Sequence, residues 1–265
     1  MDFQRACQAY IWGIPAVGIA EWRLAHRDVF RAKSGEMLSY LDFKEKLGIL
    51  TPNYTTPYLG TRYTPTLTGL GERAHLINRA IDLDTHVQDI LGVFRCEELS
   101  DVVLCGPSYG GMVITGVAEQ IAAKIRSLVY LDAFVPENGK CLFDYSAAEH
   151  SRRMRDDAAR NGKGYKITPV SAAAFAVNAE DAAWVDAMCV KQPLATFEQK
   201  LEVTRPQVAK RVYMFATGWT RPSPFQQFGD RFKDDRDWHF VSFACGHDVV
   251  VDLPQELAAA LIAAA

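Results

Sequence analysis

The sequence lacks the features that mark several large classes of protein. No apolar run reaches the roughly 20 residues that a helix needs to cross a bilayer. The N-terminus carries Asp2 and Arg5 but no signal-peptide pattern of basic, apolar and small residues. The six cysteines are scattered and form no C-x-x-C pair, so neither a zinc site nor a redox motif is expected. We therefore expect a cytoplasmic protein with mostly buried free thiols that needs no metal or cofactor.

The sequence also has little excess charge. Its 29 basic and 32 acidic residues give a formal net charge of -3. Binding to nucleic acid or to anionic lipid relies on clustered Lys and Arg, so neither is an expected partner. The 265 residues are 49% hydrophobic and 23% charged, which is ordinary for a soluble protein with a sizeable core. A small neutral molecule fits this composition better as a partner; the oligomeric state is left open.

From about residue 101 the chain alternates short apolar runs with amphipathic stretches, the order typical of βα units on a parallel sheet. We expect strands at 61–65, 101–106, 127–132, 211–216 and 238–243, and helices at 84–94, 108–121 and 254–264. The region from about 137 to 205 is more polar and helical, which indicates an inserted cap. The pattern predicts an α/β fold with a mostly parallel sheet flanked by helices.

The first 58 residues do not share this rhythm. Short helices are expected at 3–12 and 20–30, followed by a turn-rich segment at 51–58, and no catalytic signature is present. We therefore divide the chain into an N-terminal segment, 1–58, and a core with its cap, 59–265.

The strongest functional signal is the pentapeptide that runs from Gly106 to Gly110 with Ser108 at its centre. A G-x-S-x-G motif indicates a nucleophile when a strand precedes it and a helix follows, and both are predicted here. Small residues around the serine permit the sharp turn that exposes its hydroxyl. Because serine is a weak nucleophile, it needs a histidine base and a group that orients that base.

His247 is the candidate base, since it follows the last predicted strand and comes last in the order Ser, acid, His. The remaining histidines are expected to be structural or solvated: His26, His75, His86, His150 and His239. The acid is less obvious, because the loop 217–222 after the penultimate strand contains no carboxylate. We favour Asp132, at the end of the strand after the nucleophile helix, with Asp230 as the alternative. Asp248 is expected to point away from the adjacent His247.

The backbone N–H of Tyr109, directly after the nucleophile, is the expected oxyanion donor, whereas the loop that normally supplies a second donor is not visible. Four aromatic residues are candidates for a hydrophobic substrate wall, although such residues are also common in plain cores: Phe134, Phe143, Tyr145 and Trp184.

Five segments carry a family resemblance: 63–73, 83–89, 106–113, 129–136 and 246–248. On these segments the chain from about Thr61 onward resembles the esterase branch of the α/β-hydrolase superfamily that includes plant methyl-ester esterases and hydroxynitrile lyases. The resemblance implies that Ser108 is the nucleophile and His247 the base. Haloalkane dehalogenases, which are similar in fold, place their acid at the strand end that matches Asp132.

The chain departs from that family in two ways. Pro107 stands where these esterases usually have histidine, and the family's first three strands with the oxyanion loop are absent. Residues 1–58 instead resemble a fragment of an unrelated bacterial domain family of unknown function, on the segments Ala9–Pro15 and Leu50–Tyr58. We therefore expect the chain to be a fusion of two unrelated segments that are joined near Leu59. Part of 36–50 is expected to replace the family's missing third strand.

The sequence thus predicts a serine esterase that hydrolyses carboxylic esters through an acyl-enzyme. Two alternatives stay open. One is hydroxynitrile lyase-type acid/base chemistry with the same residues, and the other is a weakly active fusion that lacks a complete oxyanion hole.

Overall fold

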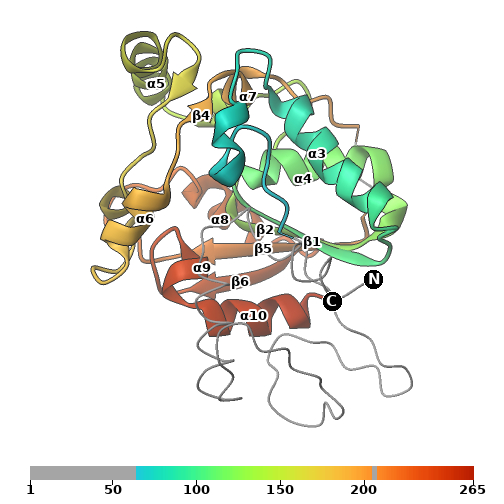
Figure 1. Cartoon of the computed structure of the whole chain (residues 1–265). Coiled ribbons are helices and arrows are strands. Elements are labelled where there is room, and N and C mark those ends of the chain that lie inside the picture. Colours follow the sequence, from blue (N-terminus) through green and yellow to red (C-terminus); the bar gives the residue numbers. More distant parts are fainter. Residues whose placement is uncertain (1–63, 205–207) are drawn as a thin grey trace, which may run out of the picture.

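The computed structural model describes residues 64–204 and 208–265, and its centre is a four-stranded parallel sheet (Figure 1). The strands lie in the order β1-β2-β5-β6 and have these bounds: β1 Val102–Ser108, β2 Ile125–Ala133, β5 Lys210–Ala216 and β6 His239–Phe243. In the register, Tyr130 of β2 lies between Gly106 of β1 and Tyr213 of β5. The predicted fold class is confirmed, as are four of the five predicted strands.

Helices cover both faces of this sheet (Figure 1). One face is covered by α3 (Leu83–Cys96), α4 (Gly110–Ile121) and α8 (Gln226–Phe232), and the other by α9 (Val249–Asp252) and α10 (Pro254–Ala263). Two short 3-10 helices, η2 (Gly71–Leu76) and η3 (Ala122–Lys124), precede α3 and β2. The helices predicted at 84–94, 108–121 and 254–264 are confirmed to within two residues of their bounds.

The core is divided by the sheet into two apolar layers. Tyr213 of β5 packs into the layer under α3, α4 and α8, while its neighbour Met214 packs into the layer under α9 and α10. Successive strand residues point to opposite faces, so a strand that is covered on both sides needs a continuous apolar run. This burial explains why the strands β2 and β5 could be located from the sequence.

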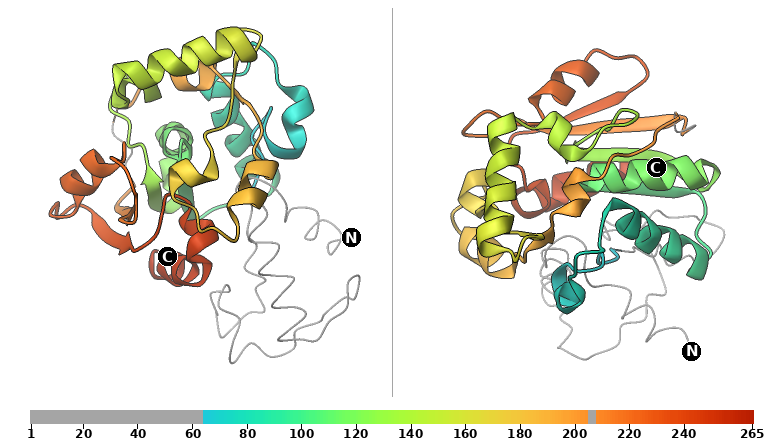
Figure 2. Two further views of the ribbon diagram at one scale, coloured as in Figure 1. Left: turned by 90° about the vertical axis from the view of Figure 1, so that its left-hand side faces the viewer. Right: turned by 90° about the horizontal axis from the view of Figure 1, so that it is seen from above.

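The predicted cap lies beyond the carboxyl ends of the strands (Figures 1 and 2). Its elements are η4 (Leu142–Tyr145), α5 (Ala148–Asn161), β3 (Lys166–Ile167), η5 (Ala172–Phe175), α6 (Ala182–Met188), β4 (Gln192–Pro193) and α7 (Ala195–Glu198). Besides these helices, the region contains a short antiparallel pairing of β3 with β4 that the sequence did not indicate.

The strand expected at 61–65 is not formed at its described end. Thr64 and Pro65 have no regular secondary structure, and within 64–204 and 208–265 β1 pairs with β2 alone. Proline has no N–H to donate to a ladder. The following Thr68 donates its N–H and its hydroxyl to Asp89 of α3 at 2.6 and 2.8 Å, so a helix side chain holds this segment.

The prediction for the cysteines is partly wrong. All five cysteines in the described part of the chain are free, but Cys141 is the one among them that is buried, while Cys96 and Cys189 are exposed. Predictions for Cys7, for the helices at 3–12 and 20–30, and for 36–50 lie outside the described residues. No described helix has the length and apolar character required to cross a membrane.

Candidate active site

Ser108 ends strand β1 in a sharp turn. Its φ of 52° lies in the left-handed region, which is uncommon for a residue with a side chain. The turn depends on glycine, because a Cβ on Gly106 would lie 2.4 Å from the carbonyl oxygen of Gly110. A Cβ on Gly111 would lie 2.0 Å from the carbonyl oxygen of Phe134. The strand, turn and helix predicted around the serine are therefore all present, and helix α4 begins at Gly110.

His247 lies in the loop after β6, and backbone contacts hold this loop in place. The N–H of His247 donates to the carbonyl of Phe175 at 2.9 Å, and the N–H of Gly218 donates to the carbonyl of Cys245 at 2.7 Å. A Cβ on Gly246 would lie 2.3 Å from the carbonyl oxygen of Ala176, so only glycine permits the close approach. His247 and Ser108 line the same cavity.

Asp132 binds the imidazole of His247. Its Oδ2 lies 2.7 Å from Nδ1, and the aspartate side chain is fully buried. A carboxylate only accepts hydrogen bonds, so Nδ1 carries the proton and Nε2 has a free lone pair. The same Oδ2 accepts the indole N–H of Trp219 at 2.9 Å, and Oδ1 accepts the N–H of Ala216 at 3.3 Å. These donors satisfy the buried carboxylate and fix its direction.

The other two acidic candidates are placed differently. Asp230 lies exposed on α8, where its carboxylate accepts from Gln226 at 3.1 Å and pairs with Lys233 at 3.4 Å. Asp248, which was expected to point away from His247, is among the residues around the same cavity, and its role as a structural residue stays a prediction. Burial raises the pKa of the Asp248 carboxyl above its usual value, while the nearby imidazole partly opposes this.

Tyr109 directly follows the serine and caps helix α4. Its backbone N–H makes no hydrogen bond with residues 64–204 or 208–265. The residue is 8% exposed, and its hydroxyl lies 2.9 Å from Nδ1 of His86. We identify no second oxyanion donor among residues 64–204 and 208–265.

Two of the four proposed wall residues line the cavity, Phe134 and Tyr145. The other two do not, and the prediction is corrected for both. Phe143 is buried under the guanidinium of Arg155, whose carbon lies 4.6 Å above its ring. Trp184 is half-buried and packs against an apolar cluster that the cap shares with α9. Neither residue lines the cavity.

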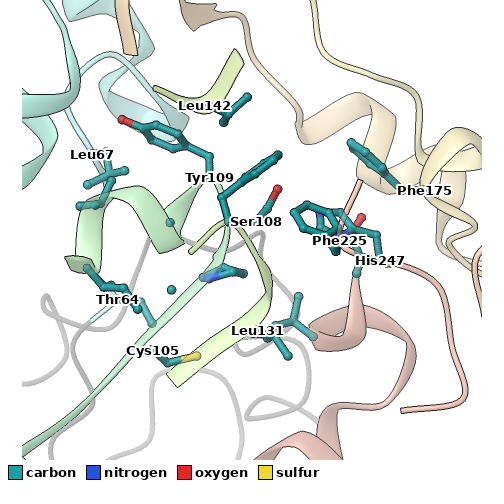
Figure 3. Close-up of a pocket in the computed structure, with 18 of the residues that line it drawn as sticks. Thr64, Leu67, Cys105, Ser108, Tyr109, Leu131, Leu142, Phe175, Phe225 and His247 are labelled. Carbon is teal, nitrogen blue, oxygen red and sulfur yellow. The ribbon is translucent and has the colours of Figure 1, made fainter. Parts of the chain in front are cut away.

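Sequence reasoning missed the aromatic residues that enclose the imidazole. Phe225 stacks on His247 with ring centroids 4.9 Å apart and an interplanar angle of 7°, and Phe175 and Trp219 lie at 4.8 and 5.2 Å. Figure 3 shows Ser108 between Tyr109 and His247, with Phe225 beside the imidazole. One signal was available: Trp219 stands in the loop where a carboxylate was sought, and its indole N–H reaches the carboxylate from another strand.

Residues 43–260 match the model of the alpha/beta hydrolase family. The chain belongs to this family. The match begins at residue 43, inside the segment expected to resemble an unrelated domain family, and that expectation has no support.

Among curated relatives, a carbendazim hydrolyzing esterase from Nocardioides sp. (strain SG-4G) is 47% identical over 210 residues, which cover 76% of this chain and 86% of that protein. Among solved structures, an extracellular α/β-hydrolase from a Paenibacillus species matches with a TM-score of 0.65 and 22% identity, over 76% of this chain and 86% of that one.

Two more distant structures have the same fold. A pyrethroid hydrolase from Sphingobium faniae JZ-2 matches with a TM-score of 0.53 and 18% identity, over 69% of this chain and 77% of that one. A methylesterase from Arabidopsis matches with a TM-score of 0.52 and 18% identity, over 75% of this chain and 84% of that one. At these identities the likeness concerns the fold alone.

Proposed function

We propose that this α/β-hydrolase is a carboxylic ester hydrolase in which Ser108 is the nucleophile, His247 the base and Asp132 the residue that orients the base. The observation that carries the proposal is the buried 2.7 Å contact between His247 and Asp132 beside a serine with φ of 52°. The contact leaves Nε2 of the imidazole to accept a proton, and the strained turn presents the hydroxyl to the same cavity.

The reaction follows from this arrangement. Nε2 of His247 takes the hydroxyl proton of Ser108 while Oγ attacks the ester carbonyl, and the N–H of Tyr109 stabilises the tetrahedral oxyanion. The imidazolium, held by Asp132, then returns the proton to the leaving alcohol. Water attacks the acyl-enzyme with His247 again as base, which releases the acid and restores the serine.

The cavity favours hydrophobic acyl or aryl groups. Phe134, Tyr145 and Phe225 lie on its wall, and the ring of Phe134 contacts that of Phe225 at 4.8 Å in an edge-on arrangement. Flat aromatic groups pack well against such rings. The esterase relative adds carbendazim as a compound to assay.

A Ser108→Ala variant tests the proposal with short-chain nitrophenyl esters. We expect wild-type protein to release a burst of nitrophenol equal to the enzyme concentration, and the variant to hydrolyse the ester at the uncatalysed rate. Equal steady-state rates in the two proteins would remove the esterase assignment. Turnover that depends on Ser108 but leaves no acyl group on it would instead favour acid/base chemistry without acylation.

Three further points belong to the proposal. The division of the chain into 1–58 and 59–265, the cap at about 137–205 and a cytoplasmic location follow from composition and motif resemblance. The family match runs through position 59 from residue 43, so a join near Leu59 is not part of the proposal.

A further inference from the structure

His86 connects the residue after the nucleophile to a distant loop. It lies on α3, is fully buried, and hydrogen-bonds through both ring nitrogens. Nε2 lies 2.9 Å from the carbonyl oxygen of Thr68, and Nδ1 lies 2.9 Å from the hydroxyl of Tyr109. Because a carbonyl only accepts, Nε2 carries the proton, and Nδ1 accepts the O–H of Tyr109. Burial lowers the pKa of His86, which keeps the ring neutral near pH 7.

The far end of this connection is also fixed. Asp89 accepts the N–H and the hydroxyl of Thr68 at 2.6 and 2.8 Å, and Arg73 donates to the Thr68 hydroxyl at 2.6 Å. Asp89 lies three residues after His86 on the same helix, so both side chains reach the same loop. The carbonyl that orients His86 therefore cannot move independently of α3.

The Tyr109 side chain is held from two elements. Its ring meets His86 of α3 edge-on with centroids 5.7 Å apart, and it meets Phe197 of α7 in the cap at 5.5 Å. Side chain and backbone N–H share one Cα, so fixing the phenol limits rotation of the peptide that carries the donor.

The geometry points to His86 as a positioning residue that, through the hydroxyl of Tyr109, aims the Tyr109 N–H at the oxyanion. The inference rests on the proposed function, because only a reaction with a tetrahedral oxyanion uses this donor. An aimed donor contributes to the transition state more than to substrate binding, so its misplacement lowers kcat and leaves KM nearly unchanged.

A Tyr109→Phe variant tests the connection, because it keeps the ring and the N–H and removes the hydroxyl. Loss of a whole oxyanion donor lowers kcat about 100-fold to 1000-fold, and a donor that is only misdirected still provides part of the stabilisation. We expect kcat on a nitrophenyl ester to fall about tenfold with KM within about twofold. The inhibition constant of an arylboronic acid, which forms a tetrahedral adduct with the serine, should rise by the same factor as kcat/KM falls.

Two substitutions of His86 separate aiming from packing. His86→Asn keeps an acceptor near the position of Nδ1, whereas His86→Gln keeps a donor near Nε2 and loses the acceptor. Both remove the same buried ring, so both should destabilise the protein. We expect H86Q to lose kcat as Tyr109→Phe does and H86N to retain most of it. The double variant H86Q/Y109F should be no slower than either single variant, because one connection is broken only once.

Tyr130→Phe is the matched control, since Tyr130 is also buried and its hydroxyl hydrogen-bonds the hydroxyl of Thr115 at 2.7 Å. It should lower the free energy of unfolding in urea without changing kcat or boronate affinity. If Tyr109→Phe behaves like this control, His86 only stabilises the fold and the inference is overturned. That result leaves the proposed function intact, because the esterase assignment fails only if Ser108→Ala keeps wild-type activity.

Discussion

Trp219 donates its indole N–H to Oδ2 of Asp132, the same oxygen that accepts the imidazole N–H of His247. The tryptophan comes from the loop after β5, which contains no carboxylate, while the aspartate ends β2. The acid and its support thus come from neighbouring strands, and the indole holds the carboxylate in the direction that the imidazole requires.

We expect Trp219→Phe to lower kcat about tenfold, because it removes one hydrogen bond to a charged group and keeps most of the ring packing. Trp238→Phe is the control, since Trp238 stacks on Phe232 at 4.0 Å and does not hydrogen-bond the carboxylate. Steady-state kinetics of both variants check the prediction. Unchanged turnover in Trp219→Phe would mean that the remaining donors suffice to hold Asp132.

Asp132→Asn should reduce kcat by about 10⁴-fold, the loss seen when the acid of a serine–histidine–acid triad becomes an amide and the imidazole takes the wrong tautomer. Asp230→Asn is the matched control, because that exposed carboxylate pairs with Lys233. Its kcat should equal that of the wild type. The opposite ranking of the two variants would transfer the acid's role to Asp230.

The elbow glycines should be far less tolerant than a glycine in an open position. Gly111→Ala places a Cβ 2.0 Å from the Phe134 carbonyl oxygen, so we expect lower stability and loss of activity. Gly92→Ala on α3 meets nothing within 4 Å and should raise the free energy of unfolding by about 0.5–1 kcal/mol, because alanine favours a helix interior. Urea unfolding of both variants measures the difference.

The buried His86 makes stability depend on pH. Its pKa is lower in the folded protein than the ordinary 6.5, so the unfolded chain binds more protons at mildly acidic pH. Stability is therefore full above about pH 6.5 and falls as the pH drops through the folded pKa. Burial is the main reason that the pKa of His86 is low, and Arg73 lowers it further. The hydrogen bond to the Thr68 carbonyl and the carboxylates of Asp89 and Asp82 raise this pKa in part.

We expect the free energy of unfolding to decrease less between pH 7.5 and pH 5.5 in His86→Asn than in the wild type, as measured in urea. The comparison with the variant removes the contribution of other groups, including Asp248, whose pKa is raised. Parallel pH profiles in the two proteins would show that His86 titrates normally.

Local motifs explain what the sequence could predict. Ser108 was found because strand, turn and helix are encoded within a few residues, and His247 because it follows the last strand. Asp132 was found from its place at a strand end. Phe225 and Phe175 were missed because they meet the imidazole through loops far apart in the chain, which no local pattern reveals.

Two of the predicted wall residues were wrong for a related reason. Phe143 and Trp184 were chosen because they are aromatic and belong to the cap, but composition does not say which face of a short helix is turned to the cavity. Phe143 instead packs against Phe197 and Arg155. The described end of the strand expected at 61–65 has no regular secondary structure, and Asp89 on α3 accepts the hydrogen bonds of the following Thr68.

The central claim is that Ser108 becomes acylated, and trapping the intermediate tests it most directly. Wild-type protein is mixed with a slowly hydrolysed aryl ester, quenched in acid and digested. The masses of the peptides are then measured by mass spectrometry. We predict one acyl group per molecule on the peptide that contains Ser108, and none in Ser108→Ala. Turnover with no acyl group on this peptide, or an acyl group on another residue, would contradict the account.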